Sequence, residues 1–331
     1  MRLFDAVWKK CALIGLLVVT VSVMAGDRPM EVDGDLPQYE KVSGISGNIS
    51  SVGSDTLNNL MALWSEGFRK KYPNVNLQVE GKGSSTAPPA LIEGNSQLGP
   101  MSRPMKAEEM EAFEKKMGYK PTAIGVALDA LAVFVHKDNP VEEMTLQQVD
   151  AIFSKTRKGG LDEIKTWGQV KEGMELSDHP VSLYGRNSAS GTYGYFKKHA
   201  LFKGDYKSQV KEQPGSSSVV MAITEDLAGI GYSGIGYKTS GVKTLKLSKK
   251  AGESAYDATA ANVLDKKYPL GRMLYVYVNK EPNKPLPAVV DQFLRYVLSK
   301  EGQEVVVKSG YIPLPAKIAG KQLAPLNAAG I

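Results

Sequence analysis

Four short segments of this sequence combine glycine with hydroxyl-bearing residues at points where a predicted strand gives way to a predicted helix. They are residues 53–56, 81–86, 99–103 and 185–192. A helix N-terminus presents unpaired N–H groups and the positive end of the helix dipole, glycine lets the backbone approach a ligand, and Ser or Thr adds a hydroxyl donor. Ordinary helix capping explains any one of these loops, but four of them together favour a site for a tetrahedral oxyanion.

Arg186 is the candidate point charge for that site. It follows the predicted strand 181–184 and precedes Ser190, Gly191 and Thr192. Its planar guanidinium and the N–H groups after it would therefore face the same ion. A surface arginine paired with a nearby acid is the alternative interpretation.

Two carboxylates, Asp55 and Asp129, are candidate proton acceptors. A carboxylate repels a bound oxyanion unless that anion carries a proton for it to accept. Monohydrogen phosphate carries such a proton and sulfate does not. Asp55 stands at a predicted helix start, where it would alternatively only cap the helix, and Asp129 stands just before an apolar strand. We favour Asp55.

A scaffold of alternating strands and helices must position these loops. Apolar residues at helical spacing follow the first loop, namely Leu57, Leu60, Met61, Trp64 and Phe68. Strand patterns separated by helical segments occur at residues 48–52, 75–79, 122–126, 181–184, 230–232 and 242–247. This alternation predicts an α/β fold with largely parallel sheets.

Two further segments, residues 131–136 and 272–279, are predicted to cross between two lobes. Each belongs to a longer apolar run, which is the pattern expected of a strand buried on both faces. Lobe 1 would comprise residues 48–130 and 280–331, and lobe 2 residues 137–271. Two crossovers would form a hinge with a ligand cleft between the lobes. One continuous doubly wound sheet is the alternative.

The N-terminus has the pattern of a cleavable secretory signal over residues 1–25. Basic residues precede an apolar stretch at 11–24, and Ala25 offers the small residue that signal peptidase requires. The alternative is an uncleaved signal anchor. Residues 26–47 are predicted to form a loose leader. Cleavage would remove Cys11, the only cysteine, so the mature chain would lack disulfides, which suits export to a bacterial periplasm.

Charge and histidine content exclude several functions. The net charge of +6 is spread through alternating acidic and basic runs, which argues against a nucleic-acid partner but is compatible with an anionic ligand. His136, His179 and His199 lie far apart and in no metal-ligand spacing. We expect no metal, no cofactor and no catalytic residue.

Several motifs together resemble those of the phosphate-binding subunits of bacterial phosphate ABC importers, the PstS-like proteins. The similarity covers about residues 44–317 and includes a C-terminal helix pair at 293–306. The motifs are VGSDTL at 52–57, GKGSSTAPPAL at 81–91, LGPMSRPM at 98–105, DALAVFVHKDNP at 129–140, GRNSASGTYGYF at 185–196 and GIGYSGIGY at 229–237. Each loop alone is weakly diagnostic, whereas the Arg-x-x-x-Ser-Gly-Thr pattern beside the other loops is specific.

The resemblance implies a two-lobed type II periplasmic-binding-protein fold with two crossover hinge strands and phosphate held in its cleft. The predicted phosphate-binding residues are Ser54, Asp55, Thr56, Ser84, Ser102, Arg103, Asp129, Arg186, Ser190, Gly191 and Thr192. The sequence departs from the family at Ser102, where many relatives carry an Asp, and at Ser188, where an acid is common. These departures leave the proton acceptor open between Asp55 and Asp129.

The function expected from the resemblance is capture of inorganic phosphate in the periplasm and its delivery to the membrane permease subunits of an ABC importer. The protein would be a monomer without enzymatic activity. A binding protein for another oxyanion, such as sulfate, molybdate or a phosphonate, is the first alternative. An exported phosphatase would need a metal cluster or a histidine near a nucleophilic serine, and neither pattern is present. An adhesion protein on the same fold is a third possibility.

Overall fold

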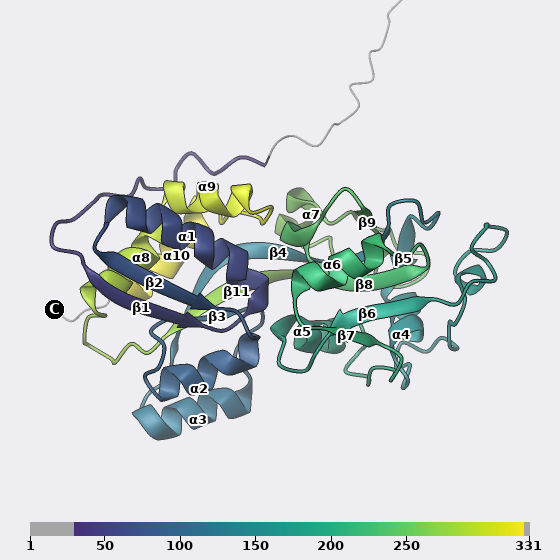
Figure 1. Ribbon diagram of the computed structural model, residues 1–331, viewed down its shortest axis with the longest axis horizontal. Coiled ribbons are helices and arrows are strands. Elements are labelled where there is room, and N and C mark those ends of the chain that lie inside the picture. Colours follow the sequence, from purple (N-terminus) through teal and green to yellow (C-terminus); the bar gives the residue numbers. More distant parts are fainter. Residues whose placement is uncertain (1–29, 328–331) are drawn as a thin grey trace, which may run out of the picture. The chain divides into compact units, whose positions relative to one another are not determined.

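The computed structural model describes residues 30–327, shown in colour in Figure 1, and the predicted signal segment lies outside them. The strands are β1 Gly47–Val52, β2 Val75–Glu80, β3 Gly99–Met101, β4 Thr122–His136, β5 Glu143–Thr145, β6 Ser182–Arg186, β7 Lys211–Gln213, β8 Gly229–Gly234, β9 Val242–Thr244, β10 Lys246–Ser248 and β11 Gly271–Val278. The α-helices are α1 Asn58–Lys71, α2 Ala87–Ile92, α3 Ala107–Met117, α4 Leu146–Phe153, α5 Gly191–His199, α6 Ser216–Thr224, α7 Ala260–Leu264, α8 Ala288–Leu298, α9 Lys300–Lys308 and α10 Ala316–Asn327. Short 3₁₀ helices are η1 Asp55–Leu57, η2 Ser84–Thr86, η3 Trp167–Gln169 and η4 Ile235–Tyr237.

The strands form one large mixed sheet and two small sheets. The large sheet has the strand order β3-β11-β4-β8-β6-β7, with β9 also paired to β4. The small sheets are the parallel pairs β1–β2 and β5–β10. A bridge between Ser51 and Leu98 places the segment leading into β3 beside β1.

The long strand β4 takes part in two sets of pairings. Its first part, from Thr122 to Ala130, pairs antiparallel with β11, and its continuation from Leu131 pairs antiparallel with β8 and then β9. The chain therefore passes at Ala130–Leu131 from the strands β11 and β3 to the strands β8 and β9. Figure 1 shows β4 running between these two groups of strands. The lobe boundaries drawn from the sequence remain a prediction.

The expectation of largely parallel sheets is wrong for the large sheet. The pairs β11–β3, β11–β4, β4–β8 and β4–β9 are antiparallel, whereas β6–β7 and β6–β8 are parallel. The reason is that β4 and β11 run in opposite directions through the middle of the sheet, and neither is joined to its neighbour by a crossover helix. Alternation of strands and helices in sequence does not reveal such strands.

The apolar patterns correctly locate the main core. Leu57 of η1 and Leu60, Met61, Trp64 and Phe68 of α1 are fully buried in one core cluster, and α1 contacts α8 and α9. The predicted strand 242–247 is divided at Leu245 into β9 and β10, which pair with different strands. Within residues 30–327, no helix has both the length and the apolar character needed to cross a membrane.

The described part of the predicted loose leader lies against the core. Leu36 is buried, and the Tyr39 hydroxyl lies 2.7 Å from the Tyr72 hydroxyl. The N–H of Lys300, at the start of α9, donates to the Pro37 carbonyl at 2.9 Å. The Gly, Pro and Asp content of this segment favours irregular backbone. The contacts of Leu36, Pro37 and Tyr39 nevertheless fix that backbone on the surface of α1 and α9.

Candidate functional site

Backbone hydrogen bonds tie the four predicted loops to one another. The Gly83 N–H donates to the Gly53 carbonyl at 2.7 Å, and the Ser54 N–H donates to the Pro100 carbonyl at 2.7 Å. The Ser85 N–H donates to the Ala189 carbonyl at 3.1 Å. The loops that follow β1, β2, β3 and β6 therefore meet at one place, although their sequence positions span more than a hundred residues.

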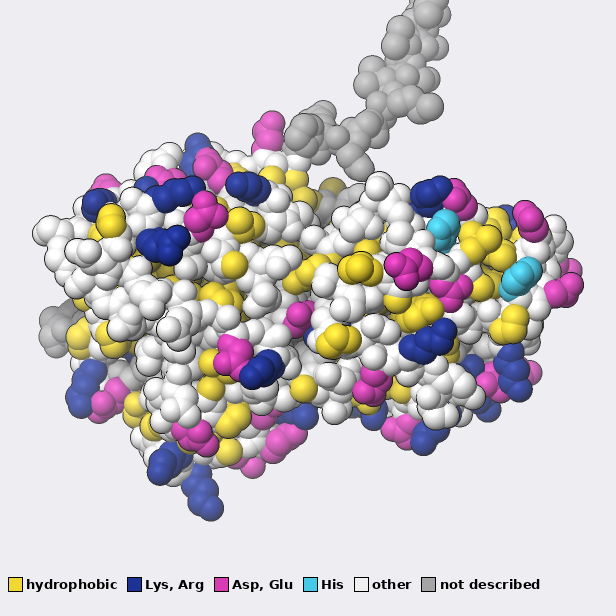
Figure 2. Space-filling model, viewed as in Figure 1, with side chains coloured by type: hydrophobic (Ala, Val, Ile, Leu, Met, Phe, Trp, Pro, Cys, Tyr) yellow, Lys and Arg dark blue, Asp and Glu magenta, His cyan; other side chains and the backbone are white. Residues whose placement is uncertain are grey.

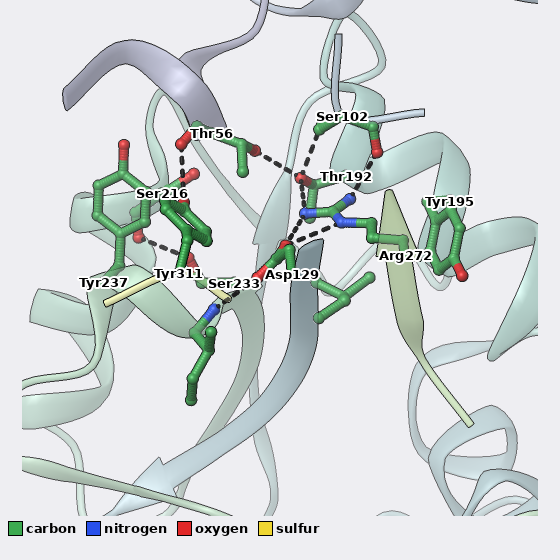
Figure 3. Close-up of polar contacts among 12 residues, drawn as sticks. Thr56, Ser102, Asp129, Thr192, Tyr195, Ser216, Ser233, Tyr237, Arg272 and Tyr311 are labelled. Atoms are coloured by element: carbon green, nitrogen blue, oxygen red, sulfur yellow. Dashed lines mark hydrogen bonds and ion pairs between the residues drawn. The ribbon is translucent and has the colours of Figure 1, made fainter. Parts of the chain in front are cut away.

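Four buried hydroxyls from these loops form a connected group, which we call the hydroxyl cluster: Thr56, Ser84, Ser102 and Thr192. The Thr56 Oγ1 and Thr192 Oγ1 atoms are 2.8 Å apart, Ser84 Oγ and Ser102 Oγ 3.3 Å, and Ser102 Oγ and Thr192 Oγ1 3.5 Å. All four residues are at most 1% exposed. Figure 3 shows Thr56, Ser102 and Thr192 directed toward one another.

Glycine at position 191 makes this convergence possible. A Cβ atom there would lie 2.6 Å from Ser102 Oγ and closer still to Ser84 Oγ. The preceding residue, Ser190, caps α5 by accepting a hydrogen bond from the Tyr193 N–H at 3.3 Å. Ser190 and Gly191 thus do what the loop pattern predicts, because they bring the positive end of a helix to the cluster.

Asp129 lies beside the cluster in a buried ion pair with Arg272, a residue that the sequence did not single out. Arg272 Nε and Nη2 donate to Asp129 Oδ2 at 2.9 and 2.7 Å, and both side chains are at most 1% exposed. Nη2 also donates to Thr192 Oγ1 at 3.0 Å, and Nη1 donates to the Ser102 carbonyl at 3.0 Å. Arg272 therefore links the Asp129 carboxylate to two cluster residues (Figure 3).

Asp55 and Arg186 form a second ion pair. Arg186 Nη1 donates to Asp55 Oδ2 at 2.9 Å and to Ser216 Oγ at 2.7 Å, while Nη2 donates to the Pro214 carbonyl at 3.2 Å. Arg186 is 2% exposed, and its Nε is a buried donor without a partner among residues 30–327. A buried unpaired donor on a cation marks a place where an acceptor is missing.

Two predicted site residues have other roles in this arrangement. The Arg103 guanidinium binds both carboxylate oxygens of Glu109 at 2.7 Å and the Ser85 hydroxyl at 3.1 Å, so the structure does not join it to the cluster hydroxyls. Ser54 is buried and contributes its N–H to the contact with Pro100. Arg103 and Glu109 are only six residues apart, so their pairing lies within reach of a local sequence pattern.

Two tyrosines that the sequence did not identify fasten the first loop. The Tyr237 hydroxyl donates to the Asp55 carbonyl at 2.8 Å, and the Tyr311 hydroxyl donates to the Thr56 carbonyl at 2.7 Å. Burial raises the pKa of both phenols above its ordinary value, and nearby aspartates raise it further. Both hydroxyls therefore remain protonated donors at neutral pH.

The remaining chemistry of the described residues is limited. Within residues 30–327, no group of three or more His, Cys, Asp or Glu side chains is placed to hold a metal ion. The site instead offers hydroxyl groups, one unpaired guanidinium N–H, helix N-termini and two carboxylates held by arginines. Such a set is suited to hold an oxyanion that carries a proton.

Comparisons with known proteins show the family to which this chain is similar. A family model described as the PBP superfamily domain matches residues 40–301. The phosphate-binding protein PstS of Pseudomonas aeruginosa is 58% identical over 319 residues, which cover 96% of this chain and 99% of that protein. The protein SphX of Synechococcus elongatus is 30% identical, with 86% of this chain and 83% of that protein covered.

A solved structure is similar as well. It is that of a candidate phosphate ABC transporter substrate-binding protein of Clostridium perfringens with bound phosphate. The TM-score is 0.70 and the identity 27%, over 81% of this chain and 100% of the other.

Proposed function

This chain belongs to the PBP superfamily and, within it, to the PstS phosphate-binding proteins, and on that premise we propose that it binds inorganic phosphate at the hydroxyl cluster. The fold is the two-lobed α/β fold of periplasmic binding proteins. The function is to bind phosphate and deliver it to an ABC importer.

One observation supports the placement of phosphate: four buried hydroxyls from separate loops contact one another. The buried Nε of Arg186, which lies in the same segment 185–192 as Thr192, has no partner within residues 30–327. Buried hydroxyls ordinarily find partners in the core, and here they contact mainly one another and the Arg272 guanidinium. A bound phosphate would replace the hydroxyl–hydroxyl contacts with shorter, charge-assisted ones. The N-terminus of α5 would add its N–H groups and dipole.

The carboxylates support phosphate over a fully ionised anion. Asp55 and Asp129 both carry their negative charge close to the proposed ligand position, and each is compensated by one arginine. Sulfate has no proton to donate, so one of its oxygens would be repelled by a carboxylate oxygen that can only accept, whereas monohydrogen phosphate would donate its proton there. Discrimination between the two anions therefore rests on a carboxylate.

The transport role has further parts that belong to the proposal. The pattern of residues 1–25 supports export to the periplasm through a cleavable signal, and the protein would act there as a monomer with the permease subunits as its partners. On the face drawn in Figure 2, basic and acidic side chains are interspersed, which supports the absence of a nucleic-acid partner.

An exported phosphatase is the alternative that an assay can separate. The cluster serines would have to act as nucleophiles, and Ser84 and Ser102 are bound to each other rather than to a histidine. Phosphate binding without turnover is therefore expected. Incubation with p-nitrophenyl phosphate should release no nitrophenol.

The test of the proposed function is a calorimetric titration of refolded, ligand-free protein with phosphate, arsenate and sulfate at neutral pH. We expect phosphate to bind at one site per chain and arsenate, which has the same shape and proton, to compete with it. Sulfate should give no measurable heat. Absence of phosphate binding would contradict the function, and equal affinity for sulfate would contradict the role of the carboxylates.

A further inference from the structure

The carboxylate of Asp55 is held by three donors on a single oxygen. Its Oδ2 atom accepts from Arg186 Nη1 at 2.9 Å, from the Ser216 N–H at 2.8 Å and from the Ser216 hydroxyl at 2.7 Å. Ser216 is 1% exposed and is the first residue of α6, so the carboxylate also lies at the positive end of that helix.

These three residues come from parts of the chain that belong to different sheets. Asp55 follows β1 of the small parallel sheet, whereas Arg186 ends β6 and Ser216 follows β7 of the large sheet. The contact thus joins the segment around residue 55 to a segment more than 160 residues later along the chain. It is made by the side chains of Asp55, Arg186 and Ser216 and by the Ser216 N–H, and it does not depend on the backbone continuity of β4 and β11.

Ser216 also fixes the guanidinium of Arg186. Its hydroxyl accepts from Arg186 Nη1 at 2.7 Å while donating to Asp55, and the Pro214 carbonyl accepts from Nη2. Both terminal nitrogens therefore have partners, and Nε is the nitrogen left without one. The Ser216 carbonyl is itself held by the Ser233 hydroxyl at 3.3 Å, as the close-up in Figure 3 shows.

We propose that Ser216 is a positioning residue of the phosphate site, which holds Asp55 and Arg186 together across the cleft when the protein is closed. The inference rests on the proposed function. Ser216 does not touch the phosphate. It orients Arg186 so that Nε faces the ligand, and it contributes two of the three hydrogen bonds that Asp55 Oδ2 accepts, the third coming from Arg186 of β6. Because these bonds must break before the cleft opens, they set the rate at which phosphate leaves.

The experiment measures phosphate association and dissociation rates in four proteins by stopped flow: the parent, Ser216→Ala, Ser216→Thr and Ser217→Ala. Ser217 is the matched control, since it is the next residue of the same helix and is exposed. Ser216→Ala removes the hydroxyl and keeps the N–H. We expect its dissociation rate to rise about tenfold, the effect of one hydrogen bond to a charged group, with little change in the association rate.

The Ser216→Thr variant tests whether the hydroxyl of Ser216 positions its partners or whether its side chain only fills space. Ser216→Thr keeps the hydroxyl and should release phosphate at close to the parent rate, and Ser217→Ala should match the parent. Equal dissociation rates in Ser216→Ala and the parent, or a Thr variant as fast as the Ala variant, would overturn the inference while leaving phosphate binding intact. A parent that binds no phosphate would overturn the proposed function and this inference together.

Discussion

Asp55 and Asp129 differ in how many of their carboxylate oxygens already have partners. Asp129 uses both, since Oδ2 accepts from Arg272 and Oδ1 accepts from the Ile235 N–H at 3.0 Å. Asp55 accepts three hydrogen bonds on Oδ2, and within residues 30–327 none reaches its Oδ1. Its side chain is 19% exposed, against 0% for Asp129. Asp55 therefore retains an oxygen that could accept the phosphate proton.

We predict that Asp55→Asn lowers the ratio of phosphate affinity to sulfate affinity by at least about tenfold, because an amide no longer repels sulfate and no longer accepts the proton with a full charge. The ratio is the quantity to measure, because loss of the Asp55–Arg186 ion pair weakens the binding of both anions. Titrations of parent and variant with each anion at one pH give it.

Asp129→Asn is the matched comparison. It should leave the affinity ratio near that of the parent but lower the free energy of unfolding by on the order of 3 kcal/mol, because Arg272 is then a buried cation without its counter-charge. Urea denaturation of the ligand-free proteins measures this. If Asp129→Asn alone lowers the ratio, the proton acceptor is Asp129 and the first loop supplies only donors.

At the scale of the elements, the start of α5 determines how closely the hydroxyl groups approach. The helix contains two glycines with different surroundings. A Cβ atom at Gly191 would collide with the hydroxyls of Ser84 and Ser102, whereas at Gly194 the nearest atom is Cδ of Arg103 at 3.5 Å, an ordinary contact. Neither glycine has a positive φ, so a substitution tests space and not backbone strain.

Gly191→Ala should weaken phosphate binding by about tenfold or more, because the new methyl group pushes two hydroxyl donors away from the ligand. Gly194→Ala should bind phosphate as the parent does. Gly194→Ala should keep or slightly raise the melting temperature of the ligand-free protein, because alanine favours a helix and meets no close atom there. Gly191→Ala should lower it, because the methyl group overpacks a buried site. Equal phosphate affinity in the parent and Gly191→Ala would place the ligand away from this helix start.

At the scale of the whole molecule, the loops were predictable and their partners were not. The loops at Gly53, Ser84 and Gly191 each follow a strand and open a helix, and this local pattern is visible without any structure. The prediction is wrong for residues 99–103, because Gly99–Met101 is itself strand β3 and α3 begins only at Ala107. The antiparallel pairing of β4 with β11 and β8 was missed, because nothing local distinguishes a strand shared by two groups of strands from an ordinary buried strand.

The site residues that the sequence did not predict belong to side-chain pairs between distant parts of the chain. Arg272 lies 143 residues from Asp129, and Ser216 lies 161 residues from Asp55. A single arginine inside the apolar run of β11 was a signal, since a buried strand carries a charge only when it has a partner. Ser216 opens its helix directly after Gly215, as Ser84 does after Gly83, and the reasoning that selects Ser84 applies to it as well.

The measurement that tests the central claim most directly is a crystal structure of the phosphate-loaded protein. We expect one phosphate whose oxygens lie within about 3 Å of the hydroxyls of Thr56, Ser84 and Thr192 and of Arg186 Nε. The Asp55–Ser216 contact should be present in the same structure. A phosphate bound only elsewhere, for example in the 660 Å³ pocket beside Lys198 and His199, would contradict the placement of the ligand at the hydroxyl cluster.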